Sequence, residues 1–425
     1  MTLFIYRLAY SFLAVLSHLL LPLLPQKLRT SLMAKWRLQK LRTEFAGRER
    51  PILIHAASGE IEYAKPLIRE LKRNYPRCPL VVMYSSPSLL KLSSSLNEVE
   101  KFIPAPFDLP YFCNQVLEIL QPRLILYART DVWPQFTLSA KKLQIPQILF
   151  AATFAENSSR LGLLSKKFTH LALSQLNEIH VVDFQDQTLL QNRLGLSSNV
   201  TGDTRYDQVF YRLFQGRQQK PLQLPTGSFR YVVFGSTWKE DEAILCSAAN
   251  SYIEKNIKIL WAPHEVNPKN IARLKGAIEA LDLSVVLLSE YLSAPRDFDV
   301  LLVDKIGYLA ELYEKAIWAF VGGSFKKQVH SVMEPLACGL RVIVGPYYKN
   351  NREAVHFSQK LLRHWPLVTV AHHLNEFKEK TLKLTLLCTD YEGERERQEI
   401  KALIQRQGGP TQRVLQTCEK YLRDL

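Results

Sequence analysis

The stretch PILIHAASGEIEYAKPLIRELKR, residues 51–73, predicts a strand, a tight turn and an amphipathic helix in direct succession. Residues 51–56 form a short, mostly apolar run that is typical of a buried strand. Gly59 permits the turn, and from residue 61 apolar side chains recur at helical spacing, at Ile61, Ala64, Leu67, Ile68 and Leu71. A strand that leads straight into a helix is half of a βαβ unit, so this stretch favours a parallel α/β sheet.

The same alternation continues along the chain in two series. Further strands are expected at Leu80–Tyr84, Arg123–Tyr127, Gln147–Ala151 and Glu178–Val182, then at Tyr231–Phe234, Ile257–Ala262, Val285–Leu288, Val300–Val303, Ala316–Val321 and Arg341–Val344. The basic stretch Arg212–Thr226 lacks clear periodicity, and we interpret it as a linker. Because 425 residues exceed one ordinary core, we expect two Rossmann-like domains facing a cleft. Ligands of such sheets bind outside the carboxyl ends of the strands.

The N-terminus is nearly all apolar from Leu3 to Leu24, interrupted by Arg7. A predominantly basic flank follows, as on the cytoplasmic side of a membrane segment. Since a charge at mid-bilayer costs ~3 kcal/mol, Arg7 favours a helix that lies in the membrane surface over one that crosses it. A buried core helix is the alternative. The expected organisation is an anchor (1–26), a first domain (27–211), a linker (212–229) and a second domain (230–425) whose last helix can pack back on the first.

The formal net charge of +15 suits anionic partners such as nucleic acid, anionic lipid or phosphorylated substrates. The basic residues cluster beside the apolar segment and no aromatic-interleaved basic motif occurs, which favours lipid over nucleic acid. The six cysteines are scattered, without the spacing of a metal site. We therefore expect reduced thiols and no metal.

Three motifs of the first half carry candidate site residues. Glu60, after the first strand, can act as a general base or merely complement the helix dipole. Asp131, in the run Ala128 to Pro134, is either a positioned site carboxylate or a cap for the next helix. Arg205, in the run Thr201 to Asp207, can bind a phosphate or carboxylate, or pair with Asp203 or Asp207.

Two motifs of the second half suit a phosphate-bearing ligand. Gly235-Ser236-Thr237 offers hydroxyls that can cap a helix or contact a phosphate. In the run Val321 to Gly339, Gly322 and Gly323 allow a ligand to approach the backbone. A helix expected near Ser331 carries Glu334 in its first turn, as a ribose contact, as part of a capping box, or as both.

Taken together and in this order, these motifs resemble the family of 3-deoxy-D-manno-octulosonic acid (Kdo) transferases of lipid A assembly, over roughly residues 30 to 420. The resemblance implies an α/β GT-B fold, a CMP-Kdo donor, and inversion of the anomeric centre with neither metal nor cofactor. It assigns Glu60 as the general base, with Asp131 and Arg205 supporting the transition state. The implied donor contacts are Ser236, Thr237, Pro263, His264, Ile306, Gly307, Tyr308, Gly322, Gly323, Ser324, Ser331, Val332, Met333 and Glu334.

Several positions depart from the family pattern. Asp131 stands where Glu is usual, Arg205 where Lys is, and Tyr308 where Glu is frequent; His264-Glu265 replaces Arg-His, and Val329-His330-Ser331 replaces Gly-His-Asn. We expect a transferase that moves Kdo from CMP-Kdo to a lipid A precursor such as lipid IVA, at the cytoplasmic face of the inner membrane. A degenerate, non-catalytic paralogue and a GT-B enzyme with another nucleotide-sugar donor are the alternatives.

Overall fold

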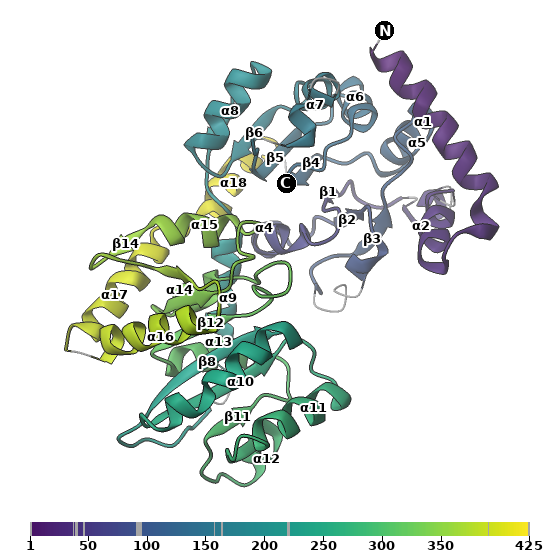
Figure 1. The fold of residues 1–425 in the computed structure, drawn as a ribbon. Helices are drawn as coiled ribbons and strands as arrows, with labels where there is room; N and C mark the ends of the chain where they lie inside the picture. The colour runs from purple at the N-terminus through teal and green to yellow at the C-terminus, as the bar shows by residue number, and fades with distance from the viewer. Residues whose placement is uncertain are drawn as a thin grey trace. The chain divides into compact units, whose positions relative to one another are not determined.

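The computed structural model describes residues 2–36, 38, 41–45, 47–90, 96–156, 158–162, 165–218, 222–389 and 391–423. The chain divides into two compact units, each with its own sheet (Figure 1). Unit 1 is Met1–Gln208 with Gln407–Leu425, and unit 2 is Val209–Arg406.

Unit 1 is built on a seven-stranded parallel sheet in the order β3-β2-β1-β4-β5-β6-β7. Its strands are β1 (Ile52–His55), β2 (Leu80–Tyr84), β3 (Lys101–Pro104), β4 (Leu124–Ala128), β5 (Gln147–Ala152), β6 (Glu178–Val181) and β7 (Asn199–Val200). Because β1 lies between β2 and β4, the chain order reverses here, and the loops that follow these three strands leave the same edge of the sheet. Such a reversal is where open α/β sheets bind ligands.

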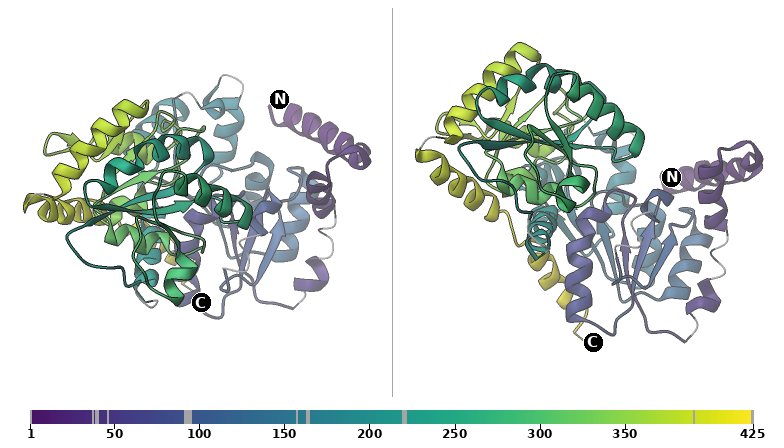
Figure 2. Two further views of the ribbon diagram at one scale, coloured as in Figure 1. Left: turned by 60° about the horizontal axis from the view of Figure 1, so that its bottom comes forward. Right: turned by 90° about the horizontal axis from the view of Figure 1, so that it is seen from below.

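Helices cover the sheet of unit 1. They are α1 (Thr2–Leu19), η1 (Leu21–Leu23), α2 (Gln26–Trp36), α3 (Leu41–Phe45), α4 (Ile61–Asn74), α5 (Pro110–Leu120), α6 (Pro134–Lys142), η4 (Ser159–Leu161), α7 (Ser165–Leu173), α8 (Phe184–Leu194) and α18 (Pro410–Glu419); α9 (Arg205–Gln218) begins in unit 1 and ends in unit 2. The C-terminal helix α18 packs against α4 (Figure 2). The Asp207 carboxylate fixes its start by accepting hydrogen bonds from the amides of Gly409 and Thr411.

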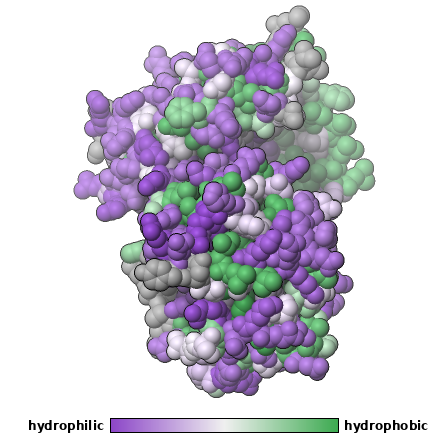
Figure 3. All heavy atoms as spheres, turned by 60° about the vertical axis from the view of Figure 1, so that its left-hand side comes forward, coloured by the Kyte–Doolittle hydropathy of each residue, from purple (hydrophilic) through white to green (hydrophobic). Residues whose placement is uncertain are grey.

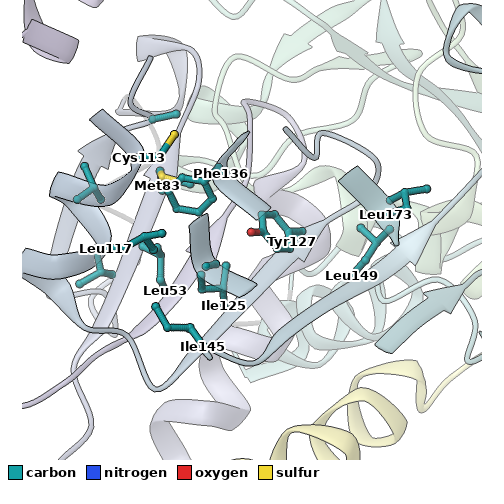
Figure 4. Close-up of a cluster of buried hydrophobic side chains, with 14 of the residues drawn as sticks. Leu53, Met83, Cys113, Leu117, Ile125, Tyr127, Phe136, Ile145, Leu149 and Leu173 are labelled. Atoms are coloured by element: carbon teal, nitrogen blue, oxygen red, sulfur yellow. The ribbon is translucent and has the colours of Figure 1, made fainter. Parts of the chain in front are cut away.

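Both faces of this sheet are buried, which explains why its strands are continuous apolar runs instead of alternating patterns. On one face, Leu53, Ile125 and Leu149 pack with residues of α5 and α6 (Figure 4). On the other face, Ile52 and Ile54 pack with α4 and α18. Successive strand residues thus serve opposite cores.

Unit 2 repeats the architecture with a parallel sheet in the order β10-β11-β9-β8-β12-β13-β16. Its strands are β8 (Arg230–Thr237), β9 (Ile257–Pro263), β10 (Val285–Leu287), β11 (Val300–Leu302), β12 (Trp318–Val321), β13 (Arg341–Val344) and β16 (Val368–Val370), with a small hairpin of β14 (Leu361–Leu362) and β15 (Trp365–Pro366). Its helices are α10 (Lys239–Ile253), α11 (Pro268–Glu279), α12 (Leu288–Ser293), α13 (Leu309–Lys315), α14 (Met333–Ala337), α15 (Arg352–Gln359), α16 (Leu374–Thr389) and α17 (Tyr391–Gln405).

The N-terminal helix has two faces. On its inner face, Tyr6 donates a hydrogen bond to Asp108, and Arg7 donates one to Gln135 at 2.9 Å. Its outer face exposes large apolar side chains, among them Phe4, Leu8 and Phe12. Within the described part of the chain, none of the helices combines the length and the apolar character needed to cross a bilayer. Arg7, whose charge argued against a membrane-crossing helix, thus has a hydrogen-bond partner within unit 1.

Candidate functional site

Three loops at the carboxyl edge of the first sheet bring together the ends of β1, β2 and β4. Glu60 follows β1, Ser85 follows β2 and Asp131 follows β4. The Glu60 carboxylate is partly exposed and accepts a hydrogen bond from the backbone amide of Ser58 at 2.8 Å. Glu60 occupies the N-cap position of α4, but its side chain does not cap that helix. It is instead held by the turn that precedes the helix, at the edge where substrates of such sheets bind.

Asp131 belongs to a polar cluster beneath this edge. Ser85 donates a hydrogen bond to its Oδ2 at 3.2 Å, and Nε2 of the buried His55 lies 3.3 Å from the Ser85 hydroxyl and 3.8 Å from Asp131 Oδ2. Burial lowers the pKa of His55, although the neighbouring charges of Asp131 and Glu60 act in the opposite sense. His55 therefore favours its neutral form.

Asp108, which the sequence did not single out, caps helix α6. Its two carboxylate oxygens accept hydrogen bonds from the backbone amides of Gln135 and Phe136, at 2.9 and 2.8 Å. The capping role considered for Asp131 is thus filled by a residue of another loop. Asp131 is left to face His55, Ser85 and Arg160, whose Nη2 lies 3.8 Å from Asp131 Oδ1.

A cluster of hydroxyls surrounds the turn that carries Glu60. Ser88 Oγ lies 2.8 Å from Ser58 Oγ and 2.9 Å from Ser86 Oγ. Gly59 between them is exposed, its φ is not positive, and a Cβ atom there would meet nothing within 4 Å. Gly59 permits the turn, as expected, but the fold itself does not require glycine there. A glycine at this position leaves open space next to Glu60 and three hydroxyls.

Arg205 forms the ion pair that we considered as one alternative. Its guanidinium lies 3.2 Å from Asp203 Oδ2 and stacks over the Tyr63 ring, 4.5 Å from the centroid. The guanidinium of Arg129 lies over the same ring at the same distance.

At the carboxyl edge of the second sheet, three aromatic rings from separate strand ends form a stack. Trp238 follows β8, His264 follows β9 and His330 follows β12. The centroid of the His264 ring lies 4.6 Å from that of Trp238 and 4.3 Å from that of His330. The Lys326 ammonium sits over the Trp238 ring, 3.4 Å from its centroid. Trp238 and Lys326 were missed from the sequence, whereas His330 stood in a quoted motif without being assigned to the site. Together with His264 they give this edge flat surfaces and positive charge.

The buried carboxylate of Asp241 holds together the loops at this edge of the sheet. It accepts hydrogen bonds from the backbone amides of Trp238, Gly323 and Phe325 at 2.8, 2.6 and 2.9 Å. Burial raises the pKa of Asp241, and the three amide donors counteract that effect. The loop after β8 and the loop after β12 are thereby held to a single side chain.

The glycine pair after β12 is explained by packing. A Cβ atom on Gly322 would lie 2.3 Å from the Ser236 carbonyl oxygen, and Gly323 has φ +79. Our interpretation that these glycines admit a ligand is therefore unnecessary, because the chain itself fills the space. Ser236 has a positive φ of 55, a conformation that costs a non-glycine residue about 1–3 kcal/mol. Such strain gathers at functional loops.

The remaining predicted donor residues lie at or after the ends of strands of the same sheet. Pro263 ends β9, and Ile306, Gly307 and Tyr308 follow β11, with Ile306 86% exposed. Thr237 is buried and accepts a hydrogen bond from the Trp261 indole, and Ser324 is buried and donates one to the Val321 carbonyl. Neither hydroxyl is turned to solvent, which weakens their assignment as ligand contacts.

Helix α14 begins at Met333, with Val332 at its N-cap. The capping box considered for Ser331 and Glu334 is replaced by other contacts. Ser331 Oγ accepts a hydrogen bond from the Met333 amide at 3.4 Å, and the Glu334 carboxylate accepts one from Arg212 at 3.0 Å. Glu334 is thus a paired carboxylate of the second unit, with Arg212 as a partner that sequence reasoning missed.

Acidification is expected to destabilise unit 2 through His330. Since an indole only donates, the 2.8 Å hydrogen bond from Trp238 Nε1 requires an unprotonated Nε2 on His330. Burial, assisted by His264 and Lys326, lowers the pKa of His330 to about 4. The unfolded chain binds this proton near pH 6.5, so stability is complete above that pH and falls towards pH 4, by about 1–2 kcal/mol after solvent screening.

This prediction is checked by thermal unfolding of the wild type and His330→Gln between pH 4 and 7. The difference between their melting temperatures should shrink as the pH falls. His170→Gln, on the exposed side of α7, is the control, and a constant difference for His330→Gln across this range would contradict the assignment.

Within the described ranges, no group of three or more His, Cys, Asp and Glu side chains is arranged to hold a metal ion. The groups gathered at the two strand edges are a carboxylate with neighbouring hydroxyls in unit 1, and stacked aromatic rings with a lysine in unit 2. The first can accept a proton from a hydroxyl, and the second can bind an anionic, planar ligand.

Known proteins resemble this chain in sequence and in fold. A family model for 3-deoxy-D-manno-octulosonic-acid transferase (kdotransferase) matches residues 33–208. The 3-deoxy-D-manno-octulosonic acid transferase of Chlamydophila psittaci is 27% identical over 70% of each chain, and that of Chlamydia muridarum is 28% identical, also over 70% of each. A UDP-GlcNAc 2-epimerase from Neisseria meningitidis shares the fold, with a TM-score of 0.60, 15% identity and coverage of 88% of this chain and all of that one.

The two parallel seven-stranded sheets thus form a GT-B-like fold. The family match covers unit 1, where Glu60 and Asp131 lie, and the relatives extend it along most of the chain. The chain is therefore a glycosyltransferase that belongs to the Kdo transferase family.

Proposed function

We propose that this enzyme transfers Kdo from CMP-Kdo to a lipid A precursor in lipopolysaccharide core biosynthesis, with inversion and without a metal. Membership of the family supports the reaction class. The observation that carries the mechanism is the Glu60 carboxylate, which is held by the Ser58 amide at the edge of the sheet and stands beside a cluster of hydroxyls.

Unit 1 binds and activates the acceptor in this mechanism. A hydroxyl of a glucosamine unit lies against Glu60, and its sugar occupies the open space beside Gly59. Glu60 takes the hydroxyl proton as that oxygen attacks the anomeric carbon of Kdo. The hydrogen bond from the Ser58 amide holds the Glu60 carboxylate in place within the turn. Asp131, held by Ser85, supplies a second negative charge that favours the positive character developing at the anomeric carbon.

Unit 2 binds the donor. Its nucleotide meets the stack of Trp238, His264 and His330, and Lys326 provides a cation for its phosphate. The bond between Kdo and the phosphate breaks as the new glycosidic bond forms, so CMP leaves with the electron pair of that bond. Positive charge near the departing phosphate lowers the barrier. Helix α14 is only five residues long, so we assign little of this stabilisation to its backbone amides.

The test of this function is release of CMP when the purified protein meets CMP-Kdo and lipid IVA together. We expect release only when both substrates are present, and a higher melting temperature with CMP than with UDP because a ligand of the native state stabilises it. Preferential stabilisation by UDP would favour another donor. Binding of CMP without turnover would favour a non-catalytic paralogue.

We also propose that α1 holds the enzyme at the cytoplasmic face of the inner membrane by lying on it. The inner face of α1 is fixed to unit 1 through Tyr6 and Arg7. Its outer face exposes apolar side chains, and hydrophobic residues gather at the receding right-hand edge of Figure 3, which is otherwise mostly hydrophilic. The exposed large apolar residues at this end of the chain are Phe4, Ile5, Leu8, Phe12, Leu13, Val15, Leu16, Leu19, Leu20, Leu23 and Leu28.

Replacing Leu8 and Phe12 with Ser should therefore weaken membrane binding at least tenfold, since each apolar side chain contributes on the order of 1 kcal/mol or more on burial. Co-sedimentation with vesicles of phosphatidylethanolamine and phosphatidylglycerol measures this. Phe184→Ser is the matched control, because Phe184 is 74% exposed on α8. Equal co-sedimentation of the double variant and the wild type would remove α1 from the membrane contact.

A further inference from the structure

A cavity of about 340 Å³ opens in unit 1 beside the candidate acceptor site. Its walls are mostly apolar and come from α1, from the loop into α6 and from α7, and they include Tyr6, Trp133, Phe154, Phe168 and Leu173. The volume lies within the range of about 300–1,000 Å³ that small-molecule sites occupy. Its mostly apolar walls favour an apolar ligand over a sugar or a phosphate.

The charged side chains that line the cavity are Asp131 and Arg160. Asp131 Oδ1 lies 3.8 Å from Arg160 Nη2, and Thr169 Oγ1 donates a hydrogen bond to the Arg160 carbonyl. Arg160 Nη1 is shielded from solvent and is without a hydrogen-bond partner among the described residues. The cavity thus has an apolar body and a polar end, and the polar end retains an unused donor.

Asp131 connects this cavity to the catalytic edge. The same carboxylate lines the cavity and accepts the hydrogen bond from Ser85 in the cluster with His55. A molecule whose polar part reaches Glu60 can therefore place an apolar part in the cavity. Tyr6 also lines the cavity, and it belongs to α1, the helix whose outer face exposes Phe4, Leu8 and Phe12.

We propose that this cavity binds a fatty acyl chain of the acceptor lipid, with Arg160 contacting an oxygen of the headgroup at its polar end. The assignment rests on the proposed function, because it takes the acceptor to be an acylated glucosamine. The cavity then orients the acceptor, since a chain held between α1 and α7 fixes how far the sugar hydroxyl reaches towards Glu60. It also makes the enzyme select acylated acceptors over the bare sugar.

Filling the cavity tests this assignment. Ala172 lines it from α7 and is buried, so Ala172→Phe places a ring inside it. Val132→Phe fills it from the partly buried loop after β4, which guards against misfolding of the first variant. His170→Phe is the matched control, because it adds the same ring at an exposed position of the same helix.

Steady-state kinetics with two acceptors give the first readout. The acceptors are lipid IVA and the same glucosamine disaccharide with its acyl chains removed. Both filling variants should raise KM for lipid IVA at least tenfold relative to wild type and His170→Phe, and should reduce the preference of the enzyme for lipid IVA over the acyl-free disaccharide. An unchanged preference in two folded variants would overturn the proposal.

Calorimetric titration of dodecyl phosphate gives a readout that does not require turnover. The wild type and His170→Phe should bind it, the filling variants should bind it at least tenfold more weakly, and inorganic phosphate alone should not compete. Competition by inorganic phosphate, or equal binding by all four proteins, would show that the cavity does not hold the chain. If the wild type releases no CMP with any acceptor, the proposed function is rejected. Weaker dodecyl phosphate binding in the filling variants alone would then still support the site for the acyl chain.

A third experiment tests whether phospholipid of the bilayer competes for the cavity. If the cavity serves ordinary phospholipid, phosphatidylethanolamine vesicles in excess should abolish dodecyl phosphate binding and should raise KM for lipid IVA in the wild type to the value of the filling variants. We expect instead that the vesicles leave the tenfold difference between these proteins intact.

Discussion

Replacing Glu60 with Gln is expected to lower kcat with CMP-Kdo and lipid IVA by about 10²–10⁴-fold, the usual value of general-base assistance. The amide keeps the shape of the side chain and can still accept the hydrogen bond from the Ser58 amide, but it cannot take up the acceptor proton. The loss should therefore appear in kcat, with KM for the lipid and the melting temperature little changed.

Glu62→Gln is the control for this experiment. Glu62 lies two positions along the same helix, and its carboxylate pairs with Lys65 at 2.7 Å. We expect this variant to keep activity within a few-fold of wild type. Should Glu60→Gln also stay within a few-fold while folded, the general-base assignment is wrong and only the fold and family stand.

Asp241→Asn is expected to destabilise unit 2 by about 1–3 kcal/mol, the cost of leaving a buried donor unpaired. One oxygen of Asp241 accepts from Trp238 and Gly323, and the other accepts from Phe325. Whichever way an amide is turned, its NH₂ group faces at least one of these backbone N–H groups. The loops after β8 and β12 are then no longer held together by this carboxylate. Because the aromatic stack lies in these loops, CMP binding should weaken as well.

Urea unfolding followed by circular dichroism measures this loss, and thermal shift with CMP measures the binding. Asp282→Asn is the control, because Asp282 is exposed and has a positive φ of 59 that Asn tolerates well. A melting curve for Asp241→Asn that overlays that of the wild type would show that these three amides do not depend on the carboxylate.

The main strands could be predicted because both faces of each sheet are buried, which leaves continuous apolar runs in the sequence. β1 and β13 are examples, and their observed bounds lie within one residue of the expected ones. The short strands β7 and β16 and the edge strand β3 were missed. β7 has two residues, and β3 begins with Lys101, so neither gives a local signal. The start of the expected linker, up to Gln218, is the end of helix α9, whose mixed polar faces hid its period.

The sequence located the strand ends that carry the candidate site, but it could not separate capping from function. For Asp131, the decision came from Asp108, which lies on a different loop and caps α6 in its place. For the pair of glycines after β12, it came from the close approach of Ser236. Both contacts join residues far apart in the chain, and no spacing rule reveals them.

The aromatic stack of unit 2 shows the same limit. Trp238, His264 and His330 come from three strand ends, and each alone is an ordinary loop residue. The available signal was that Trp238 and His264 directly follow strands of one sheet and that His330 lies in the longer loop after a third, since the carboxyl ends of these parallel strands must meet. Likewise, the apolar N-terminal segment indicated a membrane helix, but its docked inner face depends on partners more than 100 residues away.

The most direct test of the central claim is mass spectrometry of the lipid after incubation of the purified protein with CMP-Kdo and lipid IVA. We predict that the lipid gains the mass of at least one Kdo residue with wild-type protein, and that the Glu60→Gln protein leaves nearly all of it unmodified over the same time. A folded, CMP-binding wild-type protein that leaves lipid IVA unchanged would contradict the account.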